Sequence, residues 1–117
     1  MYRIALAAVD AAGGVAAIAN PEGAAVIVTR LALDVTASST GACTVDAGIA
    51  ANATTSADGL IDGLSVAATG VFDNVSDAGT NGRARAKWGA GQYLTISKAS
   101  GATAGLAGTA FVDYVLA

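Results

Sequence analysis

Short runs of apolar and β-branched residues, separated by clusters of glycine and small polar residues, recur along the whole 117-residue chain. Within several runs, apolar and polar positions alternate with a period of two, which is typical of strands with one buried face. The alanine-rich stretches near the start do not predict helices, because Gly13, Gly14 and Pro21 interrupt them. The pattern therefore predicts an all-β protein.

The predicted strands are about eight short segments with turn-forming residues between them. They cover residues 2–9, 15–18, 25–35, 42–50, 60–66, 83–88, 93–98 and 109–116. Segment 25–35 gives the clearest signal, and we expect it to form a hairpin with 42–50. Regular alternation divides 25–35 between two faces, with Ile27, Leu31, Leu33 and Val35 on one and Val26, Val28, Arg30, Ala32 and Asp34 on the other.

Strands at this spacing, with no helical segment to link parallel strands, favour an antiparallel β-sandwich with a jelly-roll-like topology. The turn Asn20-Pro21-Glu22-Gly23 carries proline and glycine at the places that a type I turn prefers. We expect residues 1–20 to form a short N-terminal extended arm or edge strand. Residues 21–117 are then the β-sandwich domain.

The composition limits the classes of partner. The chain is 54% hydrophobic, but its apolar runs are far shorter than the ~20 residues that span a bilayer. Charged residues make up 13% and the net charge is −3, which argues against nucleic-acid binding. Many apolar residues are alanines, which add little to a core. We therefore expect stability to come partly from contact with other protein subunits, with no membrane or nucleic-acid partner.

The start of the chain only faintly imitates a secretory signal. Arg3 precedes the apolar run Ile4–Val9, and Asp10 interrupts that run too early for a signal peptide. We expect a protein that is made in a cytoplasm and is used there or assembled from there.

Residue types that carry catalysis are scarce. The chain has no histidine and a single cysteine, Cys43, whose neighbours predict a buried strand residue. The carboxylates Asp73 and Asp77, with Asn74, Gly79 and Asn81, suggest only a weak calcium candidate, because the spacing and the closing glutamate of an EF-hand are missing. We expect no enzyme activity and no catalytic, cofactor-binding or metal site.

One segment concentrates positive charge. Arg83, Arg85 and Lys87 alternate with small or aromatic residues, so a strand would place the three cations on one face. This row is either a solvated strand face or a surface that pairs with carboxylates of a neighbouring copy or of an underlying surface. Trp88, on the opposite face, is expected to be a core or interface anchor. These four residues are the interface candidates.

Six stretches resemble, in order, a type of small protein encoded by tailed bacteriophages and prophages. They are Ile27–Thr36, Thr40–Gly48, Leu60–Leu64, Gly70–Asn74, Gly79–Gly82 and Ser100–Leu106. The resemblance covers residues 20–117 and rests on turn and core residues.

The resemblance implies a capsid decoration (head cement or stabilisation) protein. Such a β-sandwich binds the outside of a phage head, commonly as a trimer at three-fold or quasi-three-fold positions, and has no active site. It further implies the major capsid protein as partner, a homotrimer, and a place on the exterior of the virion. The alternative is a receptor- or carbohydrate-binding β-sandwich of a phage fibre or tail, for which exposed aromatic residues would provide the platform.

Overall fold

The computed structural model describes all residues from Met1 to Ala117 and contains nine strands and no helix. The strands are β1 (Tyr2–Leu6), β2 (Ala16–Ala19), β3 (Val26–Ala37), β4 (Cys43–Ala50), β5 (Ile61–Ser65), β6 (Gly70–Asp73), β7 (Ala86–Trp88), β8 (Tyr93–Gly101) and β9 (Ala107–Leu116). The all-β prediction is confirmed. The strand that sequence patterning missed is β6, which has only two apolar residues and so shows no alternation.

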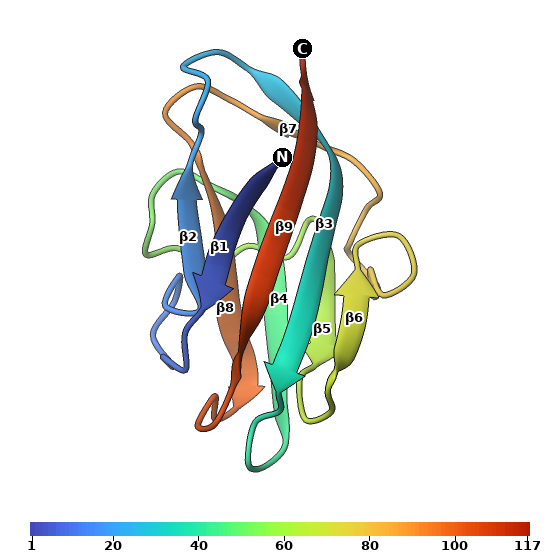
Figure 1. Ribbon diagram of the computed structural model, residues 1–117. Coiled ribbons are helices and arrows are strands. Elements are labelled where there is room, and N and C mark those ends of the chain that lie inside the picture. Colours follow the sequence, from blue (N-terminus) through green and yellow to red (C-terminus); the bar gives the residue numbers. More distant parts are fainter.

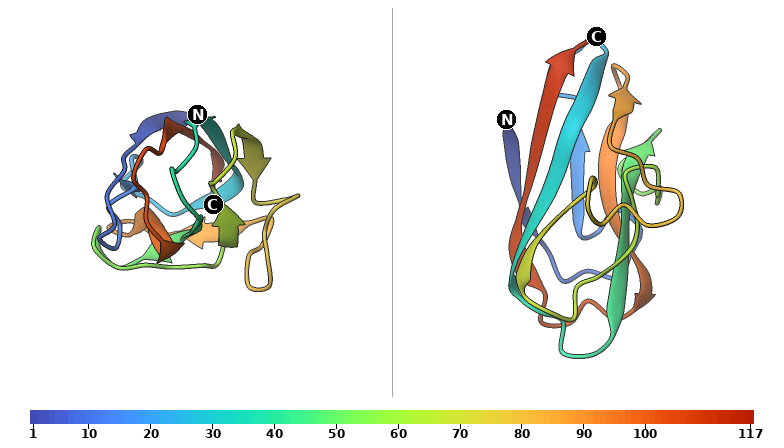
Figure 2. Two further views of the ribbon diagram at one scale, coloured as in Figure 1. Left: turned by 90° about the horizontal axis from the view of Figure 1, so that it is seen from below. Right: turned by 90° about the vertical axis from the view of Figure 1, so that its right-hand side faces the viewer.

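Two antiparallel sheets face each other in the sandwich (Figure 1). One has the order β1-β9-β3-β6, with β7 also on β3, and the other has the order β2-β8-β4-β5. β6 and β7 follow one another along the same edge of β3, opposite residues 32–35 and 26–28 respectively. The side view in Figure 2 shows the two layers facing each other.

The topology is a jelly roll. Strand pairs are nested, because β1 pairs with β9, β2 with β8, β3 with β6 and β7, and β4 with β5. This is the arrangement of one long hairpin rolled up so that its pairs alternate between two sheets. The jelly-roll-like sandwich predicted from the sequence is therefore the observed fold, with nine strands instead of eight.

The predicted hairpin between segments 25–35 and 42–50 is wrong. β3 and β4 lie in different sheets, and the loop between them crosses from one layer to the other. Hydrogen bonds to neighbouring loops hold this crossing: Ser39 N donates to Val66 O and Thr40 N to Ala104 O. A short polar turn can close a hairpin within one sheet or connect the two sheets, so the sequence of this turn alone did not distinguish the two connections.

A β-bulge in β3 corrects the predicted division of its faces. Between Val28 and Arg30 the register against β9 shifts by one residue, so that Thr29 has no partner of its own. The bulge turns Val26 and Val28 toward the same buried face as Leu31, instead of the opposite one.

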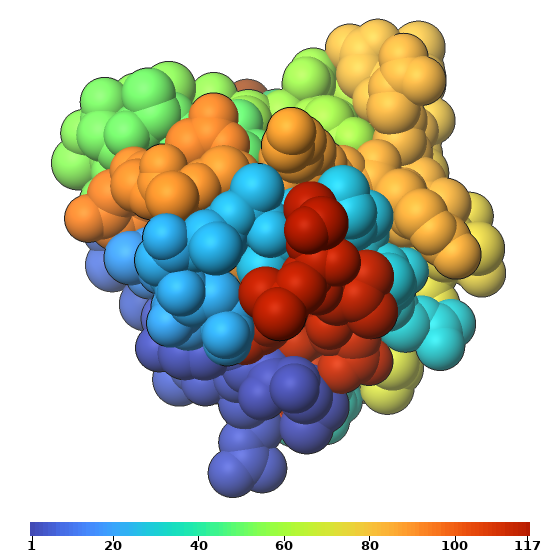
Figure 3. Space-filling view, turned by 90° about the horizontal axis from the view of Figure 1, so that it is seen from above, coloured from blue at the N-terminus to red at the C-terminus, as the bar shows by residue number.

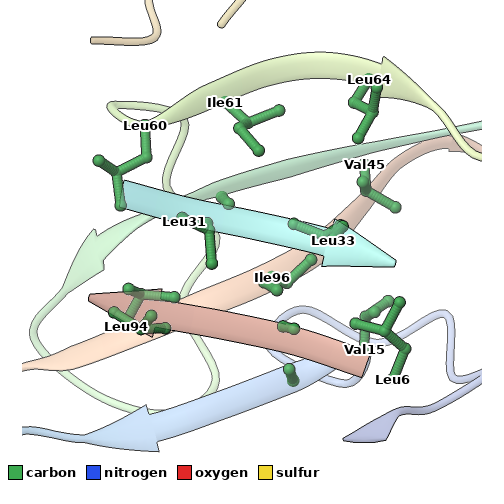
Figure 4. Packing of buried hydrophobic residues seen from close by; sticks show 14 of the residues in the cluster. Leu6, Val15, Leu31, Leu33, Val45, Leu60, Ile61, Leu64, Leu94 and Ile96 are labelled. Carbon is green, nitrogen blue, oxygen red and sulfur yellow. The ribbon is translucent and has the colours of Figure 1, made fainter. Parts of the chain in front are cut away.

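The core is one continuous cluster between the sheets. It contains 22 buried apolar residues, contributed by both layers and by loop residues such as Val15, Leu60 and Leu106. Figure 4 shows Leu31 and Leu33 of β3 close to Ile96 and Leu94 of the opposite sheet. Residues 1–20 take part in the sandwich through two edge strands, because β1 borders the first sheet and β2 the second.

Candidate functional site

The candidate cationic row, Arg83, Arg85 and Lys87, lies on the edge of the sandwich where β5, β6 and β7 come together. All three side chains are exposed. Only Ala86–Trp88 is a strand, however, and the chain bends at Ala84, so Arg83 and Arg85 precede β7. The alternation of two faces that was predicted for residues 83–88 therefore holds only within β7, Ala86–Trp88.

The backbone beneath the row is held by Asn74, which is fully buried. The side chain of Asn74 donates to Arg83 O at 2.9 Å and to Ala84 O at 3.0 Å, and it accepts a 2.8 Å hydrogen bond from Leu31 N. The main-chain N–H of Asn74 donates to Leu31 O. Asn74 thus fills the gap between β6 and β7 on the edge of β3. The sequence singled out Asn74 as part of a weak calcium candidate and of the stretch Gly70–Asn74, but it did not predict this structural role.

On its other side, the segment that contains Asn81 and Arg83 is fixed to the loop before β5 and to the start of β5. Arg83 N donates to Gly59 O at 3.0 Å, and Asn81 N donates to the Asp62 carboxylate at 3.1 Å. The Asn81 side chain donates to Asp58. Because both flanks of the segment are hydrogen-bonded, the cations project from a fixed backbone.

The three cations of the row have no carboxylate within ion-pairing distance. The one ion pair in the protein joins Arg30 to Asp73 at 2.9 Å. Half of the six basic residues of the chain lie in the row, so the remaining residues hold three cations and nine carboxylates. The row is therefore a positive patch on an otherwise acidic molecule, free to pair with an outside carboxylate.

Carboxylates gather beside the row. Partial burial, above all, raises the pKa of Asp46, and the neighbouring charges of Asp62 and Asp58 raise it further. Asp46 also accepts a 2.8 Å hydrogen bond from Gly63 N, which opposes the rise. This edge of the molecule thus presents positive and negative charges next to each other.

The structure places Trp88 in the core. The residue is fully buried at the end of β7, and its indole N–H donates to Gln92 O at 3.0 Å. Its ring meets that of Tyr114 edge-on, with 6.2 Å between the centroids. Trp88 anchors β7 and leaves no surface of its own to a partner.

The oxygen atoms of the calcium candidate are used within the chain. Asp73 accepts hydrogen bonds from Val75 N and Ser76 N and pairs with Arg30, and these contacts lower its pKa. Asp77 accepts from Asp73 N at 3.0 Å. No group of three or more histidine, cysteine, aspartate or glutamate side chains is arranged to hold a metal ion.

The remaining candidates are distributed through the fold. Cys43 is buried, as predicted, and burial raises the pKa of its thiol. Of the aromatic residues only Tyr2 is exposed, with 38% of its surface accessible. The surface has no pocket, and the chain has no helix of the length and apolarity needed to cross a membrane.

No family model, curated protein or solved structure matches the chain.

Proposed function

We propose that the protein is a structural virion component, a decoration or cement protein that binds the outside of a tailed-phage capsid. In this role it contacts the major capsid protein, assembles as a homotrimer and stabilises the shell by protein–protein contacts. The proposal rests on the sequence resemblance and on a surface suited to docking.

The observation that carries the proposal is the unpaired cationic row on a fixed backbone. Arg83, Arg85 and Lys87 are exposed and have no ion-pair partner, while the rest of the molecule is acidic. Carboxylates on a neighbouring copy or on the shell beneath would complete these pairs. Electrostatic complementarity of this kind orients partners and speeds their encounter.

One end of the sandwich is suited to close contact with another subunit. The loops 38–42, 66–69 and 101–105 lie together there, and their exposed residues are only glycine, alanine and threonine. Hydrogen bonds from Thr40 N to Ala104 O and from Ser39 N to Val66 O join the loops to one another. The view from below in Figure 2 shows these loops beside each other. The Asp10 carboxylate, which accepts hydrogen bonds from Thr103, is a charged group beside these loops. The exposed residues of the loops themselves are small and uncharged, and such residues lose little solvation when they are covered.

Charge reversal tests the role of the row. We expect the triple variant Arg83→Glu, Arg85→Glu and Lys87→Glu to fold normally, because the three side chains are exposed, and to bind empty capsids much less than the wild type. Binding is measured as the occupancy of purified shells after sedimentation.

A control reverses Arg3 and Lys98, two cations outside the row. We expect this variant to keep its occupancy, because its row is intact. Undiminished occupancy of the triple variant would remove the row from the interface. If the wild type itself does not bind expanded capsids, the decoration role is wrong.

A further inference from the structure

The loop that joins β1 to β2, residues 8–14, has no apolar anchor in the core. Figure 1 shows it near the lower end of the sandwich. Residues 8–12 are all exposed. The one large apolar side chain of the loop, Val9, is 44% exposed and lies over Gly14 of the same loop, where a Cβ would come within 2.5 Å of Val9 Cγ1. Hydrophobic burial therefore contributes little to holding this loop in place.

The two ends of the β1–β2 loop are fixed and lie close together. Ala7 N donates to Val15 O at 2.9 Å. The flanking residues Leu6 and Val15 are buried in the core. A surface loop with adjoining ends and packing of its own has the form of an Ω-loop. The loop can therefore move while β1 and β2 stay in their sheets.

Three hydrogen bonds connect the β1–β2 loop to the rest of the molecule. The Asp10 carboxylate accepts from Thr103 N at 2.9 Å and from Thr103 Oγ1 at 2.7 Å. Gly13 N donates to Ser97 Oγ at 2.8 Å. Thr103 lies in the loop between β8 and β9, and Ser97 lies on β8. These few polar contacts are what keeps the loop closed.

Asp10 makes the strongest of these contacts. Hydrogen bonds from Thr103 and the positive charge of Lys98 lower the pKa of Asp10, so its carboxyl group is ionised at neutral pH. Hydrogen bonds to a charged acceptor are shorter and stronger than bonds between neutral groups. The Gly13–Ser97 bond joins two neutral groups.

The groups beneath the β1–β2 loop are polar. The side chains of Ser97 and Thr103 are buried, with 0% and 1% of their residue surface exposed. Gly13 approaches the loop 51–59 so closely that a Cβ would lie 1.8 Å from Ala53 O. When the β1–β2 loop moves away, water can take its place as the hydrogen-bond partner of Ser97 and Thr103. Opening therefore leaves these polar groups satisfied.

The loop 20–25, which joins β2 to β3, is held far more firmly. The Asn20 side chain donates to Ala24 O, Trp88 O and Gly89 O. Tyr114 Oη donates to the Glu22 carboxylate at 2.7 Å. Figure 3 shows this loop packed beside the C-terminal residues. We expect it to stay closed as long as the sandwich is folded.

We propose that residues 8–14 open and close as one unit, with the Asp10 carboxylate as the latch, while the rest of the sandwich stays folded. This motion goes beyond the proposed decoration function and does not rest on it. Because Thr103 belongs to the loop 101–105, the latch connects the motion to the end of the sandwich that presents small uncharged residues. Segments held by few buried apolar contacts open in this local way.

Amide hydrogen exchange followed by NMR tests the local opening. Gly13 N and Thr103 N donate the hydrogen bonds that opening breaks. We expect both amides to exchange much faster than Leu60 N, which donates to Ala47 O from a fully buried residue. Low concentrations of urea should leave the Gly13 and Thr103 rates unchanged, because a local opening exposes little surface. Exchange at Leu60 should become faster with urea, since it requires unfolding of the sandwich.

Asp10→Ala tests the latch. We expect exchange at Gly13 N to become at least about tenfold faster, the factor that corresponds to the loss of a hydrogen bond to a charged group. Gly13 has no contact with the Asp10 side chain, so only opening of the whole loop carries the effect to it. Glu22 N, in the firmly held loop, should keep its rate. The matched control is Asp113→Ala, which removes an exposed carboxylate from β9 and should leave every rate unchanged.

Ser97→Ala tests the same unit from its other contact. It removes the acceptor of Gly13 N and leaves Asp10 in place, so we expect Thr103 N to exchange faster. The proposal is overturned if Asp10→Ala changes Thr103 N and not Gly13 N, or if both amides exchange in the wild type only as fast as Leu60 N. Protection of Leu60 N shows that each variant is folded, and the wild-type comparison with urea decides the point if a variant is not. Capsid binding plays no part in these measurements, so its failure leaves the proposed opening intact.

Discussion

Trp88 is the largest fully buried side chain of the protein. Replacing Trp88 by alanine leaves a cavity that the neighbouring strands cannot fill, and we expect a loss of about 3–5 kcal/mol in the free energy of unfolding. Trp88→Phe keeps most of the volume and loses the hydrogen bond to Gln92 O, so we expect a smaller loss. Urea unfolding followed by circular dichroism measures both.

The control for Trp88 is Val71→Ala, because the Val71 side chain is 72% exposed. We expect this variant to unfold at the same urea concentration as the wild type. An unchanged melting temperature for Trp88→Ala would contradict the assignment of Trp88 to the core.

Asp46 is predicted to destabilise the folded protein at neutral pH. Its folded-state pKa is raised above 3.8 by burial and by Asp62 and Asp58, so the folded state disfavours the charged form. The penalty is complete above the raised pKa and vanishes as the pH falls below 3.8. Asp46→Asn keeps an oxygen for the Gly63 N–H. We therefore expect this variant to be more stable than the wild type at neutral pH and equally stable in acid.

Asp10 is predicted to behave in the opposite way. It accepts hydrogen bonds from Thr103 N at 2.9 Å and Thr103 Oγ1 at 2.7 Å, and these lower its pKa below 3.8. The resulting stabilisation is fully present above pH 3.8 and is lost as the pH falls through the lowered folded-state pKa of Asp10. We expect Asp10→Asn to be less stable than the wild type at neutral pH, with the gap closing in acid. Urea midpoints measured against pH compare the variants, and a shift of the same sign for Asp10→Asn and Asp46→Asn contradicts the opposite roles of the two carboxylates.

At the level of the strands, hydrophobic alternation predicted where most elements lie. It did not predict pairing, because pairing depends on contacts between distant segments. The bulge in β3 shows in the burial of its residues and not in the sequence, where Ile27 fits the odd-numbered face and alternation appears unbroken. The buried residues Val26 and Val28 have even numbers and Leu31, Leu33 and Val35 have odd numbers, a change of parity that requires an extra residue between them.

The candidate site was predictable only in part. The cations and Trp88 stand out as residue types, but their backbone is set by Asn74, whose role arises from a contact with Leu31 that lies 43 residues away. A single buried amide gives no periodic signal. The bend at Ala84 likewise follows from the hydrogen bonds that Asn74 donates, which the local sequence does not encode.

The connection from β8 to β9 depends on Gly101. This residue has a φ of +76°, and a Cβ there would lie 1.9 Å from Ala42 O. We expect Gly101→Ala to lose about 1–3 kcal/mol from left-handed strain alone, with the clash adding to it. At Gly41, in the adjacent loop, a Cβ would meet nothing within 4 Å and φ is not positive. We expect Gly41→Ala to be neutral or to gain about 0.4–1 kcal/mol. Thermal unfolding distinguishes the two, and equal effects would contradict the special role of Gly101.

The whole molecule offers different surfaces in different directions. One lateral edge carries the cationic row, and one end carries loops whose exposed residues are glycine, alanine and threonine, with the Asp10 carboxylate bonded to one of them. A small domain with two such surfaces can contact more than one neighbour at once. This arrangement favours a role within an assembly, where each contact adds to the stability of the others.

The consequence for the assembly is a prediction about particles. If the protein cements a capsid, particles that lack it should assemble and then release their DNA at a lower temperature than decorated ones, because the shell loses the buried contacts that resist internal pressure. Adding purified wild type should restore retention, and the triple charge reversal of Arg83, Arg85 and Lys87 should not. The rescue should also weaken as salt rises, since the Debye length falls from about 10 Å at 0.1 M to about 3 Å at 1 M. DNA release is followed by dye fluorescence during heating. Equal release temperatures with and without the protein would exclude a stabilising role.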